Sequence, residues 1–293
     1  MRYVLENDTL RVEIDSFGAE LKSVKRKSDG KEYMWYADKK YWGRTSPVLF
    51  PFVGNCRNKE YRYGGKTYAM GQHGFARDME HTMESQTADT IWFSLHSNEE
   101  TMEKYPFAFV LKIGYNLTGN ELKVMWKVEN PDTKTLYFSI GAHPAFLCPF
   151  NGEENKLGYG LQFAGLKEVH HHGNTPDTGL AVMSEDIVIP LEDEKVYFTP
   201  GFFDRCTYMV EGKQTGEVSL VTPDGKPYVT MDFDAPLFAI WSPEGKDAPF
   251  VCIEPWYGRC DADDFDGTLE ERAYENAVEP EQTFEASYSI RYL

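Results

Sequence analysis

The sequence predicts an all-β protein of antiparallel strands with few short helices. Apolar and polar residues alternate along much of the chain, which is the pattern of strands with one buried face. Turn signals recur between these segments, and convincing helical patterns are rare. A large sandwich or barrel is therefore expected. Because no long linker or internal repeat is present, residues 1–293 are most simply one domain.

The first predicted strands are short and separated by glycine turns. Residues 10–14 alternate aliphatic and charged side chains, and a second strand follows Gly18. An Asp-Gly pair at 29–30 predicts a turn into residues 33–36, and a Gly-Gly pair within residues 63–68 predicts a hairpin. These signals are typical of neighbouring antiparallel strands.

The middle and end of the chain carry the clearest strands. Apolar side chains occupy alternate positions at 107–115, 122–128, 136–140 and 284–292, and further strands are predicted at 218–221, 228–233, 237–241 and 250–254. One short helix is expected, because Thr268 and Glu271 have the spacing of a capping box; it would run to about Asn276.

Composition excludes several classes of function. The chain has 47 acidic and 30 basic residues and a formal net charge of −17, so it would be repelled by nucleic acids and by anionic membranes. It has no apolar run of 18 residues and no signal-peptide pattern, so we expect a cytoplasmic protein. Its five cysteines are odd in number and contain no Cys-x-x-Cys pair, which indicates reduced thiols and no structural zinc site.

One histidine and one glutamate suggest acid/base chemistry. His143 follows a predicted strand in the apolar run Gly-Ala-His-Pro-Ala-Phe, where a following proline stiffens the loop and partial desolvation suits a proton donor. Glu254 ends another apolar strand, before Pro255 and Trp256. The residues alone leave a structural interpretation open, in which Glu254 pairs with Arg259 and His143 is a core histidine.

A second polar and aromatic segment covers residues 42–78. Arg44 and Arg77 lie among apolar and proline residues, where an arginine is costly unless it binds an anion or several oxygens. Pairing with structural carboxylates is the alternative, and both interpretations stay open. Gln72 and His73 add neutral donors and acceptors of the kind that bind hydroxyl groups.

Four short motifs carry a family resemblance. They are Ser-Pro-Val-Leu-Phe-Pro at 46–51 with Gly54, His-Gly-Phe-Ala-Arg-Asp at 73–78, Gly-Ala-His-Pro-Ala-Phe at 141–146, and Ile-Glu-Pro-Trp at 253–256. In this order the chain resembles the aldose 1-epimerase (galactose mutarotase-like) family, most closely its LacX-type and hexose-6-phosphate-mutarotase-like branches. The resemblance extends over nearly the whole chain.

The resemblance implies a galactose-mutarotase-like β-supersandwich whose concave sheet holds a free sugar. It also implies that Glu254 is the general base for the C1 hydroxyl and His143 the general acid for the ring oxygen. Ring opening, rotation about the C1–C2 bond and closure would then invert the anomeric centre. No cofactor is needed for this reaction.

The same resemblance indicates further substrate-binding residues. Sugar-contacting positions of the family correspond to Arg44, Gln72, His73 and Arg77. Asp204 is a weaker match, because a cysteine and an extra threonine interrupt its motif. Trp256 and Phe146 would offer stacking faces for a pyranose ring or belong to the core.

Other polar clusters carry less weight. His170, His171 and His172 are interpreted as a solvated loop, since adjacent residues of an extended chain point in opposite directions. Residues 261–266 are acidic but lack the glycine and glutamate of an EF-hand, and are likewise interpreted as a solvated loop. Cys148 and Cys252 have no basic partner in the sequence, so a cysteine nucleophile is not expected.

The sequence leaves three functions open. The first is an aldose 1-epimerase acting on a neutral aldohexose, and the second is a hexose-6-phosphate mutarotase in which Arg44 and Arg77 bind the phosphate. The third is a non-catalytic sugar-binding or sensing protein on the same fold. The presence of both His143 and Glu254 favours catalysis, and the lack of a further basic cluster favours a neutral sugar. The sequence is compatible with a monomer or a homodimer.

Overall fold

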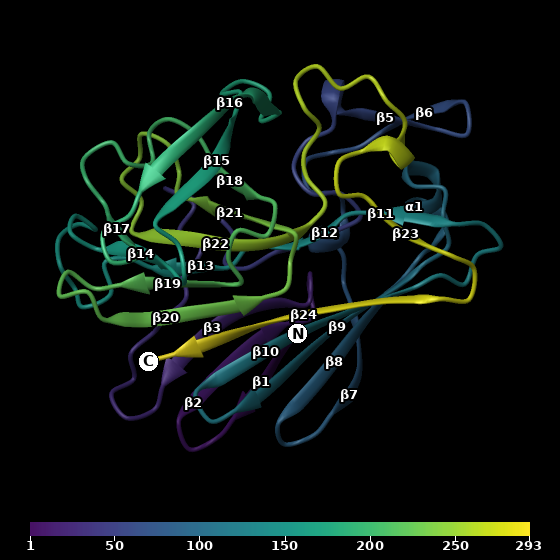
Figure 1. Ribbon diagram of the computed structural model, residues 1–293. Coiled ribbons are helices and arrows are strands. Elements are labelled where there is room, and N and C mark those ends of the chain that lie inside the picture. The colour runs from purple at the N-terminus through teal and green to yellow at the C-terminus, as the bar shows by residue number, and fades with distance from the viewer.

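Two large antiparallel sheets form most of the computed structural model, which describes residues 1–293 (Figure 1). The nine-stranded sheet has the spatial order β17 (Lys195–Tyr197), β14 (Gly160–Phe163), β19 (Glu217–Val221), β20 (Pro227–Phe233), β24 (Thr283–Tyr292), β10 (Glu121–Glu129), β9 (Val110–Thr118), β8 (Thr90–His96) and β7 (Thr82–Gln86). The eight-stranded sheet has the order β16 (Ala181–Pro190), β15 (Glu168–Asn174), β18 (Tyr208–Glu211), β21 (Leu237–Trp241), β22 (Phe250–Tyr257), β12 (Ile140–Ala142) and β4 (Val48–Leu49), with β13 (Ala145–Leu147) pairing separately with β22.

Smaller sheets and short helices complete the fold. A three-stranded sheet contains β1 (Arg2–Glu6), β2 (Leu10–Asp15) and β3 (Glu20–Arg26). Two two-stranded sheets are the hairpin of β5 (Glu60–Tyr63) and β6 (Lys66–Ala69), and the long-range pair of β11 (Leu136–Phe138) and β23 (Asn276–Val278). The helices are α1 (Glu99–Lys104) and the 3-10 turns η1 (Arg57–Lys59), η2 (Ala76–Asp78) and η3 (Leu269–Glu271). None of them has the length and apolar character needed to cross a membrane.

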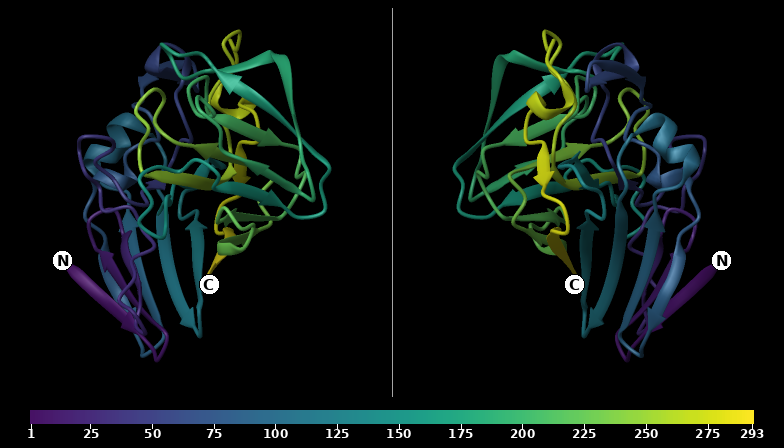
Figure 2. Two further views of the ribbon diagram at one scale, coloured as in Figure 1. Left: turned by 90° about the vertical axis from the view of Figure 1, so that its left-hand side faces the viewer. Right: turned by 90° about the vertical axis from the view of Figure 1, so that its right-hand side faces the viewer.

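The buried faces of these sheets pack around one main core. In β10, Leu122, Val124, Trp126 and Val128 are buried while their neighbours are more exposed, as the sequence predicts. The β1–β3 sheet lies beside the β7–β10 end of the nine-stranded sheet (Figure 2), where the ring centroids of Tyr3 and Phe93 are 5.3 Å apart. A single cluster of 60 buried residues includes side chains from all three of the larger sheets.

The predicted helix after Thr268 is largely wrong. The capping box forms, with the Thr268 N–H donating to Glu271 Oε2 at 2.7 Å, but the helical turn ends at Glu271. Arg272 is already extended, because its guanidinium turns into a buried ion-pair network with Asp261 and Glu275. Local capping therefore starts a turn that tertiary contacts then stop.

Two other expectations need correction. The three histidines at 170–172 belong to strand β15 and not to a loop, although their side chains do alternate, with His171 buried and His170 bonded to Asp186. The segment 261–266 is not simply a solvated loop, since Asp261 is buried against Arg272. Helix α1 was not predicted, although Asn98 and Thr101 form a capping box at its start.

Candidate active site

His143 and Glu254 face each other because of how β12 and β13 pair with β22. Gly141 pairs with Trp256 on one side of His143, and Ala145 pairs with Cys252 on the other. Both pairs share one register, which places His143 opposite Glu254. Two residues far apart in the sequence are thus brought together by backbone pairing.

Gly141 permits this close arrangement. A Cβ atom at this position would lie 2.6 Å from Cδ1 of Trp256, well inside van der Waals contact. Larger residues would therefore push Trp256 or the strand aside. The glycine of the histidine motif has a packing role next to the pair.

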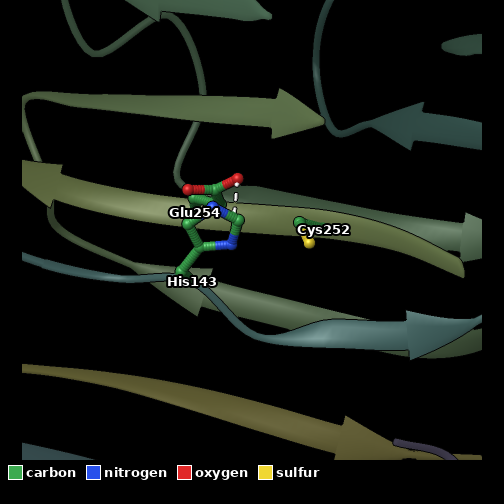
Figure 3. A group of neighbouring side chains, drawn as sticks. All are labelled: His143, Cys252 and Glu254. Carbon is green, nitrogen blue, oxygen red and sulfur yellow. Dashed lines mark ion pairs between the residues drawn. The ribbon is translucent and has the colours of Figure 1, made fainter. Parts of the chain in front are cut away.

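The side chains of the pair are close but do not form a hydrogen bond. His143 Nδ1 lies 3.4 Å from Glu254 Oε1, as the dashed line in Figure 3 marks. Both residues are buried, with Glu254 only 1% exposed. His143 Nδ1 and Glu254 Oε2 have no hydrogen-bond partner, although buried polar atoms normally have one. A ligand rich in hydroxyl groups could satisfy both.

Burial drives the pKa values of the pair in opposite directions. It raises the pKa of the Glu254 carboxyl well above its usual range, and the neighbouring Trp256 indole opposes this shift without making a hydrogen bond of ordinary geometry. Burial, with the positive charges of Arg77 and Arg44, lowers the pKa of His143 to about 3. The neutral forms are therefore favoured, and the pair holds a single proton, on Glu254.

Cys252 lies beside this pair. Its sulfur, a His143 ring nitrogen and a Glu254 oxygen all lie within 4.8 Å of one another, a donor set that zinc uses (Figure 3). However, Cys252 packs in an apolar cluster with Trp35 and Phe250, and burial raises the pKa of its thiol well above the usual range. Because metals bind the thiolate, this thiol is poorly suited to ligation, and the absence of a metal stays a prediction.

The pair opens into a cavity of about 400 Å³. Polar side chains and a few large aromatic and sulfur-containing side chains line it, including Trp42, Asn55, Gln72, His73, Arg77, Asn174, Asp177, Thr178, Thr207, Met209, Trp241, Glu244 and Trp256. This combination suits a small polar ligand with an apolar face. The cavity contains four of the six predicted substrate-binding residues, namely Gln72, His73, Arg77 and Trp256.

His73 and Arg77 are fixed in the cavity wall by backbone contacts. The Gly54 N–H donates to His73 Nδ1 at 3.0 Å, and the His73 N–H donates to the Gly54 carbonyl at 2.8 Å. Burial lowers the pKa of His73 well below its usual range, so His73 is neutral and its Nε2 carries the proton. Arg77 donates to the Gln72 carbonyl at 2.7 Å, while its buried Nε makes no hydrogen bond.

Arg44 and Asp204 lie outside the lining of this cavity. Arg44 donates to Asp78 Oδ1 at 2.8 Å, so it pairs with a carboxylate as the alternative interpretation expected. Asp204 is exposed beside a second cavity of about 290 Å³ and accepts a hydrogen bond from Gly245 N–H at 3.1 Å. The interrupted motif around Asp204 therefore does not bring its side chain to the pair.

Contacts in the structure also show the positions of Arg259, Phe146 and Trp256, for which the sequence left more than one interpretation. Arg259 pairs with Glu211 at 3.1 Å and not with Glu254. Phe146 is fully buried in the main core and does not line the cavity. Trp256 is buried yet reaches the cavity.

Sequence reasoning missed several lining residues. Trp241 ends an apolar strand segment, which equally describes a core, and Trp42 was visible only as an aromatic residue at the start of the segment 42–78. The end of β15 contributes Asn174 and the loop after it contributes Asp177 and Thr178. Asn55 holds this loop by donating to the Thr178 carbonyl at 2.9 Å. The loop was not predicted from the sequence, and nothing in the sequence indicated that it reaches the cavity.

Known proteins resemble this chain in sequence and in structure. The sequence model of the family described as aldose 1-epimerase matches residues 1–261. The chromosomally encoded protein LacX of Lactococcus lactis subsp. lactis is 31% identical over the full length of both chains. A galactose mutarotase related enzyme from Lactobacillus acidophilus superposes with a TM-score of 0.94 at 37% identity, covering 100% of this chain and 97% of the other. A galactose mutarotase-like protein from Lactobacillus casei gives a TM-score of 0.91 at 29% identity over the full length of both chains. The predicted all-β, galactose-mutarotase-like fold is confirmed.

Proposed function

Because the chain belongs to the aldose 1-epimerase family, we propose that it interconverts the α and β anomers of a free aldohexose. The observation that carries the proposal is the pair itself. His143 Nδ1 and Glu254 Oε1 lie 3.4 Å apart beside a cavity of about 400 Å³, and each residue retains a buried polar atom without a partner. Pure binding needs no such acid/base pair.

The proposed reaction moves two protons. Glu254 removes the proton from the C1 hydroxyl while His143 protonates the ring oxygen, so the C1–O5 bond breaks and C1 becomes an aldehyde. Rotation about the C1–C2 bond presents the other aldehyde face to the C5 hydroxyl. Closure reverses both transfers, with Glu254 donating to the aldehyde oxygen and His143 accepting the C5 hydroxyl proton.

The protonation state that burial favours corresponds to the open-chain stage of this cycle, so the proton of Glu254 must pass to His143 before ring opening begins. Glu254 in its neutral form with neutral His143 is the state that follows ring opening, and its charged counterpart with protonated His143 is the state that starts it. Both states hold one proton in total. The pair therefore returns to its starting state with each closure and needs no proton from solvent.

The cavity wall supplies neutral and cationic donors for sugar hydroxyl groups. We propose that Gln72, the Nε2–H of His73 and the guanidinium of Arg77 hold the hydroxyls, and that Trp256 packs against the apolar part of the ring. Arg44 would act through Arg77 and Asp78 rather than by direct contact. Asp204 is left out of the proposed site because it lies beside the other cavity.

A phosphorylated hexose is the second candidate substrate. The buried Nε of Arg77 makes no hydrogen bond and lies 3.7 Å from Asp78 Oδ2, so it can still donate to an anionic group nearby. Against this, Arg44 is already paired with Asp78, and Asp177 and Glu244 add negative charge to the cavity lining. The balance favours a neutral sugar.

Anomer exchange measured by polarimetry or NMR tests the proposal. Freshly dissolved α-glucose, α-galactose and α-glucose 6-phosphate are followed with wild-type protein and with His143→Asn. We expect faster equilibration of a neutral sugar that disappears in the variant, and no competition by inorganic phosphate. Preference for glucose 6-phosphate with phosphate inhibition would instead support the second substrate. If no sugar equilibrates faster than in buffer but one raises the melting temperature, the protein binds sugar without turning it over.

A further inference from the structure

The His143 ring has no hydrogen bond to fix its orientation. Histidines used in catalysis are commonly oriented by a hydrogen bond from one ring nitrogen to a carboxylate or a backbone carbonyl. Here Nδ1 is buried without a partner, and its distance of 3.4 Å from Glu254 Oε1 does not make a hydrogen bond. Something other than hydrogen bonding must therefore hold the ring toward Glu254.

Aromatic rings enclose His143 on several sides. The indole of Trp42 stacks on the imidazole, with centroids 4.6 Å apart and planes 27° from parallel. The indole of Trp241 meets it nearly at right angles, at 5.3 Å and 84°, and His73 packs edge-on at 5.6 Å. Trp42 and Trp241 also contact each other, at 5.4 Å and 71°. The two indoles thus form a corner into which the imidazole fits.

The chain segment that carries Trp42 is tied to the histidine loop. The Trp42 carbonyl accepts a hydrogen bond of 2.8 Å from the indole N–H of the fully buried Trp35. Ala145, two residues after His143, donates to the Thr45 carbonyl at 2.9 Å and accepts from the Trp35 N–H at 2.9 Å. Backbone bonds on both sides of Trp42 therefore keep the indole and the imidazole in register.

We propose that Trp42 and Trp241 form an aromatic clamp that positions the His143 ring for proton transfer. This inference rests on the proposed epimerase function for its kinetic consequences, but the clamp itself is a structural claim. Trp42 would act through His143, as a positioning residue. Its indole face would also stabilise the imidazolium that the reaction needs, against the positive charges of Arg77 and Arg44.

Substitutions at Trp42 test the clamp. Trp42→Leu keeps an apolar side chain but removes the stacking face, and Trp42→Phe keeps a smaller one. We expect the leucine variant to lose roughly tenfold in kcat with KM nearly unchanged, because the ring then samples unproductive orientations. The phenylalanine variant should recover most of this loss. Tyr41→Leu is the matched control, since Tyr41 packs on Trp35 in the same segment without lining the cavity, and its kcat should match that of wild type.

An NMR measurement tests the clamp independently of activity. The ring proton of His143 bonded to Cε1 should resonate upfield in wild type because of the indole ring current. It should move downfield in Trp42→Leu, partly in Trp42→Phe and not in Tyr41→Leu. Melting temperatures show whether each variant is folded. If wild type shows no anomer exchange but these shifts appear, the clamp stands and the proposed function fails.

Two outcomes would overturn the clamp. In the first, Trp42→Leu raises KM with kcat unchanged, which would make Trp42 a contact surface for the sugar. In the second, the His143 resonance is the same in folded wild type and Trp42→Leu, which would mean that the indole does not lie over the imidazole.

Discussion

The pKa values of His143 and Glu254 shift in opposite directions because the pair is removed from water without being paired with full charges. Burial is the largest cause at both residues, and the two nearby arginines add to it at His143. Two groups with ordinary pKa values of about 4 and 6.5 thereby exchange their order of protonation. The pair can then hold one proton across a wide pH range.

This arrangement predicts an unusual pH dependence for kcat/KM, which reports the free protein. The pair loses its active single-proton state on the acid side only when a second proton binds. Because the pKa of His143 is lowered to about 3, this happens well below the ordinary histidine range. We expect kcat/KM for the preferred sugar to fall by less than about twofold as the pH is lowered from about 7.5 to 5. A decline with a midpoint near pH 6.5 would show that His143 titrates as an unperturbed histidine.

The sequence indicated which residues belong to the candidate site better than it indicated which residues contact one another. The motifs around His143 and Glu254 indicated the pair, and the family resemblance of the segment around His73 predicted that Gln72, His73 and Arg77 bind substrate; all three line the cavity. The resemblance did not place Asp204 correctly relative to this cavity, because its interrupted motif gave the residue type but not the direction of the side chain. Trp42 was not singled out, since stacking on His143 depends on contacts that no local pattern reveals.

At the scale of elements, one buried network holds the strand ends near the site. Arg272 donates to Asp261 Oδ1 at 2.7 Å, to Glu275 Oε2 at 3.0 Å and to the Arg259 carbonyl at 2.9 Å, just beyond β22. Glu275 in turn accepts from Ser139 Oγ at 2.6 Å, immediately before β12. The network thus connects the ends of the two strands that carry Glu254 and the histidine loop.

Breaking this network should destabilise the protein strongly. Arg272→Met keeps most of the side-chain volume but leaves two carboxylates buried without their cation, so we expect a loss of roughly 3–5 kcal/mol in the free energy of unfolding. Urea denaturation of wild type and variant measures this loss. Arg291→Met is the control, because Arg291 pairs with Glu217 and Asp232 while 36% exposed, and should cost less than about 1 kcal/mol. Equal losses in the two variants would contradict the structural role of the network.

Strands were predicted more reliably than helices for a physical reason. Alternation in β10 and β24 records burial against a core, and this signal extends over many residues. The capping box at Thr268 is local, and the Arg272 network ended the helix after one turn. The network could not be predicted, because Asp261, Glu275 and Ser139 meet only in the folded chain.

At the scale of the whole molecule, one core cluster of 60 residues spans the three larger sheets. We propose on this basis that residues 1–293 form a single domain. The decisive pairing for function is long-range, since β12 and β13 flank His143 and both pair with β22. Alternation predicted strands such as β9, β10 and β24 but missed β8, β16 and β18. The order of strands in the sheets was not predictable either, because alternation does not identify partners.

Buried neutral histidines make the stability of the folded chain depend on pH. His81 is 2% exposed, its Nδ1 lies 3.1 Å from the Met79 carbonyl, and its Nε2 is unpartnered. Burial lowers its pKa to about 4, whereas the unfolded chain has the ordinary value near 6.5. The unfolded state therefore binds this proton first, so the stability contributed by His81 is complete above pH 6.5 and is lost as the pH falls toward 4.

Comparing wild type with His81→Phe isolates this effect from other titrating groups, such as Glu275, whose raised pKa acts in the opposite direction. The unfolding free energy of wild type relative to the variant should fall by about 2 kcal/mol between about pH 7.5 and 5. Urea denaturation at several pH values measures this difference. A difference that is constant with pH would show that His81 is not held neutral by the fold.

The measurement that most directly tests the central claim is anomer exchange by Glu254→Gln. Saturation-transfer NMR on the preferred sugar reports turnover, and the melting-temperature shift caused by the same sugar reports binding. Glutamine keeps the shape of the side chain but cannot accept the C1 hydroxyl proton as a base, so we expect binding within about threefold of wild type and a loss of at least about 10² in exchange rate. If Glu254→Gln exchanges anomers as fast as wild type, Glu254 is not the base and the proposed mechanism is wrong.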